Sequence, residues 1–279
     1  MAKKPFTTTE KVEACPGCGH KDFAVKYAPD VCRCAACHLL FRHPRPTQAE
    51  IADAYDLGDT YEEWHQQETH YTALWQRRIK LVQSHAPSGR LLDVGVGDGG
   101  FLAEALKAGY TCEGTELSQT GANFAKEKGI QVRMGQFTDL EWPENHFDVI
   151  TLWHVLEHLP NPGEAVRHAF KLLKQNGVLI IAVPNETHPI LKHRLKGTRP
   201  SPFGPLLRGC EVHLSHFQPR TLTALLKWGG FHVEELAVDD FYPDRSPAKR
   251  FKVGCYQLLA KLTRWHFAAC MQAIARKPK

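Results

Sequence analysis

The chain has 279 residues, of which 43% are hydrophobic and 23% are charged, proportions typical of an ordinary soluble globular protein. Its net charge of +5 is mild and falls short of the charge blocks that mark an obligate nucleic-acid binder. No apolar run approaches the roughly 18 residues of a membrane span, and no apolar stretch follows the charged start. We therefore expect a cytoplasmic protein without a transmembrane segment, large enough for one α/β domain and a small appendage.

Five of the nine cysteines are crowded near the N-terminus, in two C-x-x-C pairs with one spare thiol. The pairs are Cys15 with Cys18 and Cys34 with Cys37, and the spare thiol is Cys32. Paired knuckles at this separation are typical of a tetrahedral zinc site, and a site closed by four thiolates is structural. We predict a zinc-ribbon-like domain over residues 1–43, with a metal-free loop or a redox pair as the alternatives.

Residues 44–89 are expected to form a helical linker. Thr47 and Glu50 fit a capping box for a helix that runs to Tyr55. Apolar and aromatic residues then recur at helical spacing over 61–86, from Trp64 onward, and Pro87 follows.

From residue 90 the chain alternates between strand and helix patterns. Strands are predicted at 91–94, 111–117, 130–134, 147–153, 177–183, 231–238 and 268–275. Helices are predicted at about 101–107, 118–128, 161–174, 219–228 and 251–262. Repeated βαβ units predict a doubly wound, mostly parallel sheet, interrupted by an irregular insert at 185–217.

A glycine loop follows the first of these strands, over residues 93–100 (DVGVGDGG). It opens a helix, and the next strand ends in Glu116, whose carboxylate could accept the hydroxyls of a ribose. These features indicate a nucleoside-containing cofactor and leave two candidates open. A nicotinamide dinucleotide calls for G-x-G-x-x-G, whereas the spacing here is G-x-G-x-G.

Further motifs appear in order at 143–150 (PENHFDVI), 153–159 (WHVLEHL), 214–217 (LSHF), 222–226 and 230–231. Together with the glycine loop they resemble class I S-adenosylmethionine-dependent methyltransferases, over roughly residues 44–279. The resemblance is nearest to the branch with the ubiquinone-biosynthesis and other small-molecule methyltransferases. It implies a Rossmann-like methyltransferase domain over 90–279 whose last strand is antiparallel, and zinc ribbons precede some of its members.

The resemblance also implies roles for individual residues. Glycines would pass under the methionine and ribose, an acid would face the methionine ammonium, and a second acid would hold the ribose. Other side chains would border the adenine or lie near the sulfonium. The expected cofactor residues are Asp93, Gly95, Gly97, Gly99, Glu116, Leu117, Gln136, Phe137, Trp153 and His154.

Four histidines are candidate bases for the methyl acceptor: His154, His158, His213 and His216. We select His158 and His216 as the catalytic residues. Some relatives hold a divalent metal on the pair that matches Glu157 and His158, so a bound Mg²⁺ is an alternative to a purely structural His158.

The acceptor is expected to be a small molecule methylated at oxygen or carbon. Five cationic residues in the insert suggest that it is anionic, although a solvated loop explains them equally well. They are Lys192, Arg194, Lys196, Arg199 and Arg208. A nicotinamide-dependent oxidoreductase and a non-catalytic cofactor-binding scaffold are the alternatives. Nucleic acid is not favoured, because residues 183–186 do not match the motif used on base amines.

The last predicted helix carries its apolar residues on one face: Phe251, Cys255, Leu258, Leu259 and Leu262. Five cations flank that face: Lys249, Arg250, Lys252, Lys261 and Arg264. We expect this face to pack on the domain core, with contact to a membrane surface as the alternative.

Overall fold

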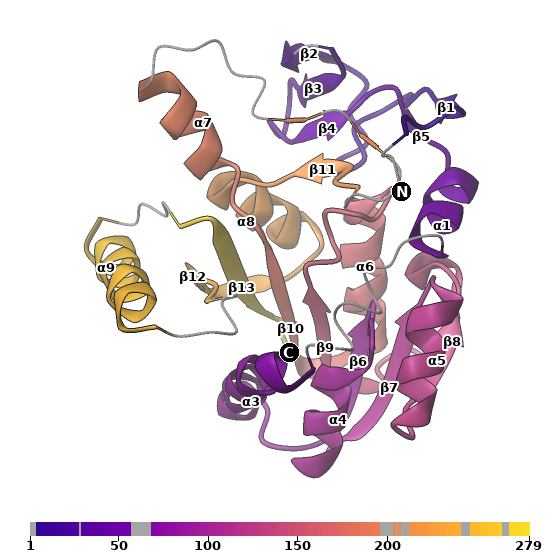
Figure 1. Ribbon diagram of the computed structural model, residues 1–279, viewed down its shortest axis with the longest axis vertical. Coiled ribbons are helices and arrows are strands. Elements are labelled where there is room, and N and C mark those ends of the chain that lie inside the picture. The colour runs from indigo at the N-terminus through magenta and orange to yellow at the C-terminus, as the bar shows by residue number, and fades with distance from the viewer. Residues whose placement is uncertain are drawn as a thin grey trace.

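The computed structural model describes residues 4–27, 29–56, 68–195, 203–204, 206–207, 212–240, 246–263 and 268–279. A seven-stranded sheet forms the centre, with helices on both faces, and a smaller four-stranded sheet lies at one end of it (Figure 1). A further pair of strands, β1 (Thr9–Glu10) and β5 (Arg45–Pro46), joins the N-terminal segment to the start of the linker.

The central sheet has the order β12-β13-β10-β9-β6-β7-β8. Its strands are β6 (Arg90–Val94), β7 (Thr111–Glu116), β8 (Gln131–Met134), β9 (Phe147–Trp153), β10 (Leu173–Pro184), β12 (His232–Val238) and β13 (Cys270–Arg276). Strand β13 runs antiparallel to both of its neighbours, whereas the pairs from β10 to β8 are parallel. The prediction of a mostly parallel Rossmann-like sheet with an antiparallel last strand is confirmed.

Helices cover the sheet in two layers, and the strands between them are buried on both faces. On one face lie α3 (Glu68–His85), α4 (Gly100–Lys107) and α5 (Gln119–Glu127); on the other lie α6 (Pro162–Leu172) and α8 (Pro219–Trp228). Leu91 packs on the first side and its neighbour Leu92 on the second. This explains why β10 is apolar without interruption from Val178 to Val183 rather than alternating.

The linker is helical, as predicted. Helix α1 (Gln48–Asp56) ends close to the expected residue, and α3 ends at His85. The predicted helix over 61–86 begins in a segment, 57–67, that lies outside the described residues together with Trp64.

The four-stranded sheet joins the N-terminal segment to the insert. Its order is β11-β4-β3-β2, with β2 (Phe23–Tyr27), β3 (Val31–Cys34), β4 (Leu40–Arg42) and β11 (Ser215–His216). We expected the insert to be irregular throughout. It instead contributes strand β11 to this sheet and also contains helix α7 (Thr187–Leu195). Strand β11 is only two residues long and forms through pairing with distant residues, which no local pattern reveals.

The N-terminal cysteine segment packs directly on the main domain. The amide of Gly163, in the first turn of α6, donates to the carbonyl of Pro16 at 3.1 Å. A Cβ added at Gly163 would lie 2.0 Å from the carbonyl oxygen of Gly17, so only glycine allows this approach. Cys15, Leu39 and Phe41 belong to the same buried cluster as the strands beneath α6 and α8. The domain boundaries at residues 43 and 89 stay predictions.

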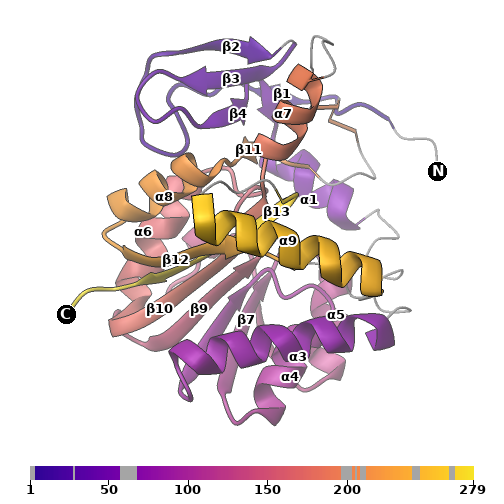
Figure 2. The same ribbon diagram turned by 90° about the vertical axis from the view of Figure 1, so that its left-hand side faces the viewer.

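Helix α9 (Pro247–Thr263) lies across one side of the molecule in Figure 2. Our prediction that its apolar face packs on the core is wrong: Phe251 is 76% exposed and Leu262 is 75% exposed. The opposite face of the helix, which carries Val253, is the buried one. Among the described residues, no helix combines the length and the apolarity that crossing a membrane would need.

Candidate active site

A cavity of about 310 Å³ opens at the carboxyl edge of the central strands. Its walls come from α1 and α3, from the glycine loop after β6, from the ends of β7 and β9, and from residues 212–213. Most of the predicted cofactor residues line this cavity: Asp93, Gly95, Gly97, Glu116, Leu117, Gln136, Phe137, Trp153 and His154. Parallel α/β sheets bind ligands at this edge, beside the point where the strand order reverses.

The glycine loop adopts the left-handed backbone that its sequence suggests. The φ angles of Gly95, Gly97 and Gly99 are 73°, 56° and 78°. Gly95 and Gly97 line the cavity, but Gly99 does not. Gly99 instead precedes α4, where an added Cβ would lie 2.7 Å from Ile130 Cδ1 and 2.9 Å from Ala125 Cα. Its role is therefore to let α4 pack closely on α5.

Glu116 connects the end of β7 to the glycine loop. Its Oε2 accepts a hydrogen bond from the amide of Gly97 at 2.9 Å. Its Oε1 accepts bonds from the amides of Leu117 at 2.7 Å and Ser118 at 2.9 Å. The buried carboxylate thus orders the loop and faces the cavity at the same time.

Asp93, the penultimate residue of β6, lines the cavity and is almost fully buried. Its Oδ1 accepts a hydrogen bond from Thr151 Oγ1 at 2.6 Å. Burial disfavours the charged form and raises the pKa of Asp93 to about 8, although Thr151 and the nearby Arg78 act in the opposite direction. At neutral pH this carboxyl is mainly protonated and ready to ionise beside an incoming cation.

A buried ionic chain that the sequence did not reveal borders the cavity at Trp153 and His154. The guanidinium of Arg78, on α3, lies 4.2 Å from the ring centroid of Trp153 and 3.3 Å from Asp239. Asp239 in turn bonds His154 Nε2 at 3.0 Å. Burial opposes the charge on His154, but Asp239 and Glu157 outweigh it and raise the pKa of His154 to about 9. One sequence feature could have indicated this chain of charges: Arg78 lies three residues after Trp75, among the apolar positions of the predicted helix.

Glu157, His158 and His213 lie close together, and all three line the cavity. One ligand atom from each lies within 4.8 Å of the others. Both carboxylate oxygens of Glu157 are buried without a hydrogen-bond partner among the described residues, and His154 Nδ1 lies 3.6 Å from one of them. His213 reaches the cluster because the amides of Leu214 and Ser215 donate to the Glu157 carbonyl at 2.8 and 3.0 Å. The sequence analysis named Glu157 and His158 as a possible metal-binding pair, but it did not place His213 with them.

His158 has a fixed orientation. Its Nδ1 lies 2.9 Å from the carbonyl oxygen of Val212, a distance at which Nδ1–H donates. In the neutral imidazole this bond fixes the proton on Nδ1 and leaves Nε2 unprotonated, which is the form that a base or a metal ligand needs.

His216, the other predicted catalytic residue, does not line the cavity. It is buried behind β4, with its ring 4.1 Å from that of Phe203 and its Nδ1 3.1 Å from Glu186 Oε1. Burial lowers the pKa of His216. Pairing of β11 with β4 turns this side chain away from the cavity, so the structure does not support His216 as the base.

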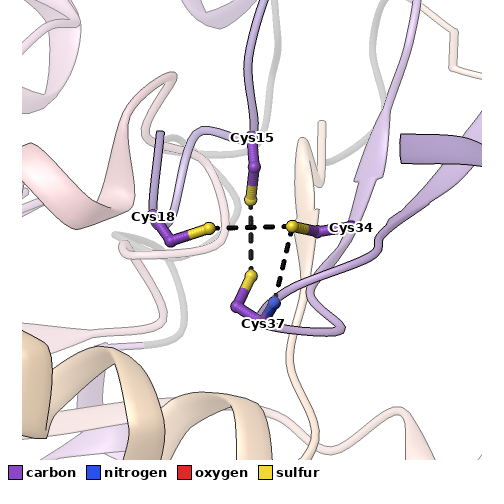
Figure 3. Close-up of side chains that lie close together, drawn as sticks. All are labelled: Cys15, Cys18, Cys34 and Cys37. Atoms are coloured by element: carbon purple, nitrogen blue, oxygen red, sulfur yellow. Dashed lines mark hydrogen bonds between the residues drawn. The ribbon is translucent and has the colours of Figure 1, made fainter. Parts of the chain in front are cut away.

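The four paired cysteines converge on one point, as Figure 3 shows. Cys15 Sγ lies 3.4 Å from Cys37 Sγ, and Cys18 Sγ lies 3.6 Å from Cys34 Sγ. Four sulfurs around a tetrahedral zinc ion, each about 2.3 Å from the metal, lie roughly 3.8 Å apart. Cys32 stays outside the group and pairs with Phe41 in the sheet. The thiols therefore match the ligand set that the sequence predicts for zinc.

The prediction that cations of the insert contact an anionic acceptor falls outside the described residues. The side chains of Lys192, Arg194, Lys196, Arg199 and Arg208 all lie outside the described residues.

Fold and cavity together define an enzyme that binds a nucleoside-containing cofactor. Residues 64–236, more than half of the chain, match the family model described as a methyltransferase domain. The chain belongs to this family and is an S-adenosylmethionine-dependent methyltransferase. This assignment overturns the nicotinamide-dependent oxidoreductase as an alternative.

Two curated relatives show how far the likeness extends. A ubiquinone biosynthesis O-methyltransferase of Coxiella burnetii is 28% identical over 175 residues, which cover 60% of this chain and 72% of that protein. An uncharacterized protein of Methanocaldococcus jannaschii is 29% identical over 133 residues, which cover 48% of this chain and 60% of that protein. The chain thus spans less than two thirds of the second relative.

Two solved structures share the fold at low identity. The complex between the Trm112 methyltransferase activator of Haloferax volcanii and a methyltransferase matches with a TM-score of 0.56 and 15% identity, covering 81% of this chain and 96% of the matched chain. An S-adenosylmethionine-dependent methyltransferase from Thermotoga maritima matches with a TM-score of 0.52 and 20% identity, covering 78% and 95%.

Proposed function

We propose that the enzyme moves the methyl group of S-adenosylmethionine to an oxygen or carbon atom of a small-molecule acceptor inside the 310 Å³ cavity. One observation carries the proposal. All the predicted cofactor residues except Gly99 line the same cavity as the Glu157–His158–His213 cluster, so a methyl donor and an acceptor could meet there. Bringing the two together in line is the main task of such an enzyme, because the sulfonium is already a good leaving group.

In this proposal the cofactor lies along the carboxyl edge of β6, β7 and β8. Gly95 and Gly97 pass under the methionine and ribose, Asp93 faces the ammonium, and Glu116 accepts the ribose hydroxyls. Leu117, Gln136 and Phe137 border the adenine, and Trp153 and His154 lie near the sulfonium. Gly99 supports the loop through packing and does not touch the cofactor.

His158 is the residue we assign as general base for an acceptor hydroxyl. With Nδ1–H bonded to the Val212 carbonyl, Nε2 can take the acceptor proton while the oxygen attacks the methyl carbon. The name of the C. burnetii relative, an O-methyltransferase, favours oxygen as the methylated atom. The acceptor is a small molecule, and the cationic residues in the sequence of the insert favour an anionic one.

The alternative role for the same cluster is a divalent metal site. Glu157, His158 and His213 supply one carboxylate and two imidazoles, and the unbonded Glu157 oxygens suit a cation. Such a metal would lower the pKa of an acceptor hydroxyl. Two imidazoles favour Mn²⁺, Fe²⁺ or Zn²⁺ over the Mg²⁺ predicted from the resemblance, since Mg²⁺ prefers oxygen ligands.

We also propose that Cys15, Cys18, Cys34 and Cys37 bind one structural zinc ion. Four thiols this close cannot all ionise without a cation. The hydrogen bond with Cys37 lowers the pKa of Cys15 to about 5, whereas burial raises the pKa of Cys18 to about 11. A cytoplasmic location, where thiols stay reduced, suits this site.

The cofactor is tested by thermal unfolding with S-adenosylmethionine, S-adenosylhomocysteine or NADH in excess. A ligand that binds only the folded state raises the unfolding midpoint. We expect a rise with both adenosyl compounds and none with NADH. Glu116→Gln, which keeps an acceptor oxygen for the loop amides, should weaken the rise strongly, and Glu235→Gln on β12 is the surface control. A rise with NADH alone would sink the proposal.

Turnover is tested with a panel of phenols and other small acceptors, with and without added Mn²⁺. His158→Gln should abolish methylation, whereas His216→Gln should retain it. Loss in His213→Gln, together with a need for Mn²⁺, would assign the cluster to a metal; retention in His213→Gln without metal would assign His158 as the base. Cofactor binding with no turnover on any acceptor would support the non-catalytic scaffold instead.

A further inference from the structure

Helix α9 presents an apolar stripe to solvent. At 100° per residue, Phe251, Cys255, Leu258, Leu259 and Leu262 fall within a sector of about 100°. All five side chains are exposed, from 38% for Leu259 to 76% for Phe251. The helix rests on the domain through its opposite side, where Val253 is 8% exposed. Water therefore contacts the side of the helix that is richest in leucine.

Cationic residues flank this stripe, and the helix contains no acidic residue. Lys252 and Lys261 lie on opposite sides of the stripe at about 100° and −80° from Phe251, and both are exposed. Lys249 and Arg250 add two more charges within the same helix. Long basic side chains beside an apolar stripe can bury their stems while their charged ends reach anions.

The stripe lies on one side of the molecule that also carries α7. Figures 1 and 2 agree that α7 and α9 are on this side. Leu195, the last residue of α7, is 79% exposed. Exposed large apolar side chains are thus found on two elements of this side.

We propose that α9 docks the enzyme on an anionic phospholipid surface, lying in the plane of the headgroups with its leucine stripe in the acyl boundary. The charge of α9 distinguishes between the possible binding partners of this surface. A cationic helix without acidic residues complements anionic headgroups, whereas the core of a protein interface is depleted of charge and of lysine in particular. A second copy of this chain would bring cations against cations. The proposal concerns where the enzyme sits and does not depend on which acceptor it methylates.

Vesicle co-sedimentation of the full chain tests this docking. Vesicles of phosphatidylcholine alone are compared with vesicles that also contain phosphatidylglycerol, at low and high ionic strength. We expect binding to the anionic vesicles only, weakened by salt. Leu258→Ser with Leu262→Ser should reduce binding at least about tenfold, and Lys252→Glu with Lys261→Glu should do the same.

Leu106→Ser, at an exposed leucine on α4, is the matched control and should bind like the unchanged protein. Equal unfolding midpoints would show that the variants fold. Two results would overturn the proposal: no binding of the unchanged protein to anionic vesicles, or undiminished binding of both α9 variants. A concentration-dependent dimer that the leucine variant makes monomeric would instead assign the stripe to self-association.

Discussion

Asp93 links the protonation state of the protein to cofactor binding. Its folded pKa of about 8 lies above the unfolded value, so its protonated form favours the fold. That contribution is complete below pH 4 and is lost as the pH rises through 8. In the proposed complex the methionine ammonium faces Asp93 and would reverse the preference, because a nearby cation stabilises the carboxylate.

We therefore predict that cofactor binding at pH 7 releases about one proton. Calorimetry of S-adenosylhomocysteine binding in phosphate and in Tris checks this, because a released proton makes the measured enthalpy depend on the buffer. Asp93→Asn removes the ionisable group and should abolish that dependence. Equal enthalpies in both buffers for the unchanged protein would contradict the prediction.

At the scale of elements, Gly99 determines how closely α4 approaches α5. Gly99→Ala adds a Cβ against Ile130 and Ala125 and strains a residue with φ of +78°, so we expect a loss of about 3 kcal/mol of unfolding free energy. Gly109→Ala is the control: its φ is +90°, but nothing lies within 4 Å of the added Cβ. The unfolding free energy of Gly109→Ala should fall by only about 1 kcal/mol.

Denaturant unfolding measures both glycine variants. The affinity of Gly99→Ala for S-adenosylhomocysteine should stay near that of the unchanged protein, since Gly99 does not line the cavity. A cofactor-binding loss larger than the stability loss would restore the role that the sequence had suggested for this residue.

The regular elements could be predicted because their patterns are local. The strand at 147–153 and the helix at 219–228 have the predicted ends, since an apolar run and helix-terminating residues are signals that act over a few residues. The orientation of α9 could not be predicted, because an apolar stripe does not say whether it faces protein or water. His213 meets Glu157 only through hydrogen bonds between distant backbone segments, so its place in the cluster also had no local signal.

The whole molecule shares one core between its cysteine segment and its main sheet. Cys15 and Cys34 are buried in the same cluster as Val166 and Leu222. If the four cysteines hold zinc as proposed, a strong chelator should lower the unfolding midpoint of the entire chain in a single transition. Cys18→Ser should behave like the chelated protein, and Cys255→Ser, at an exposed thiol outside the cluster, should not. Two separate transitions would show that the cysteine segment unfolds independently.

The pairing of β11 with β4 also sets an order for assembly during synthesis. The ribosome releases β2, β3 and β4 first, but residues 215–216 emerge only after the five strands from β6 to β10. Until then β4 is an open edge, able to pair with another nascent chain. The nascent chain therefore exposes the unpaired edge of β4 during most of its translation. Truncated mRNAs that end before codon 215 would yield fragments in which this edge stays unpaired.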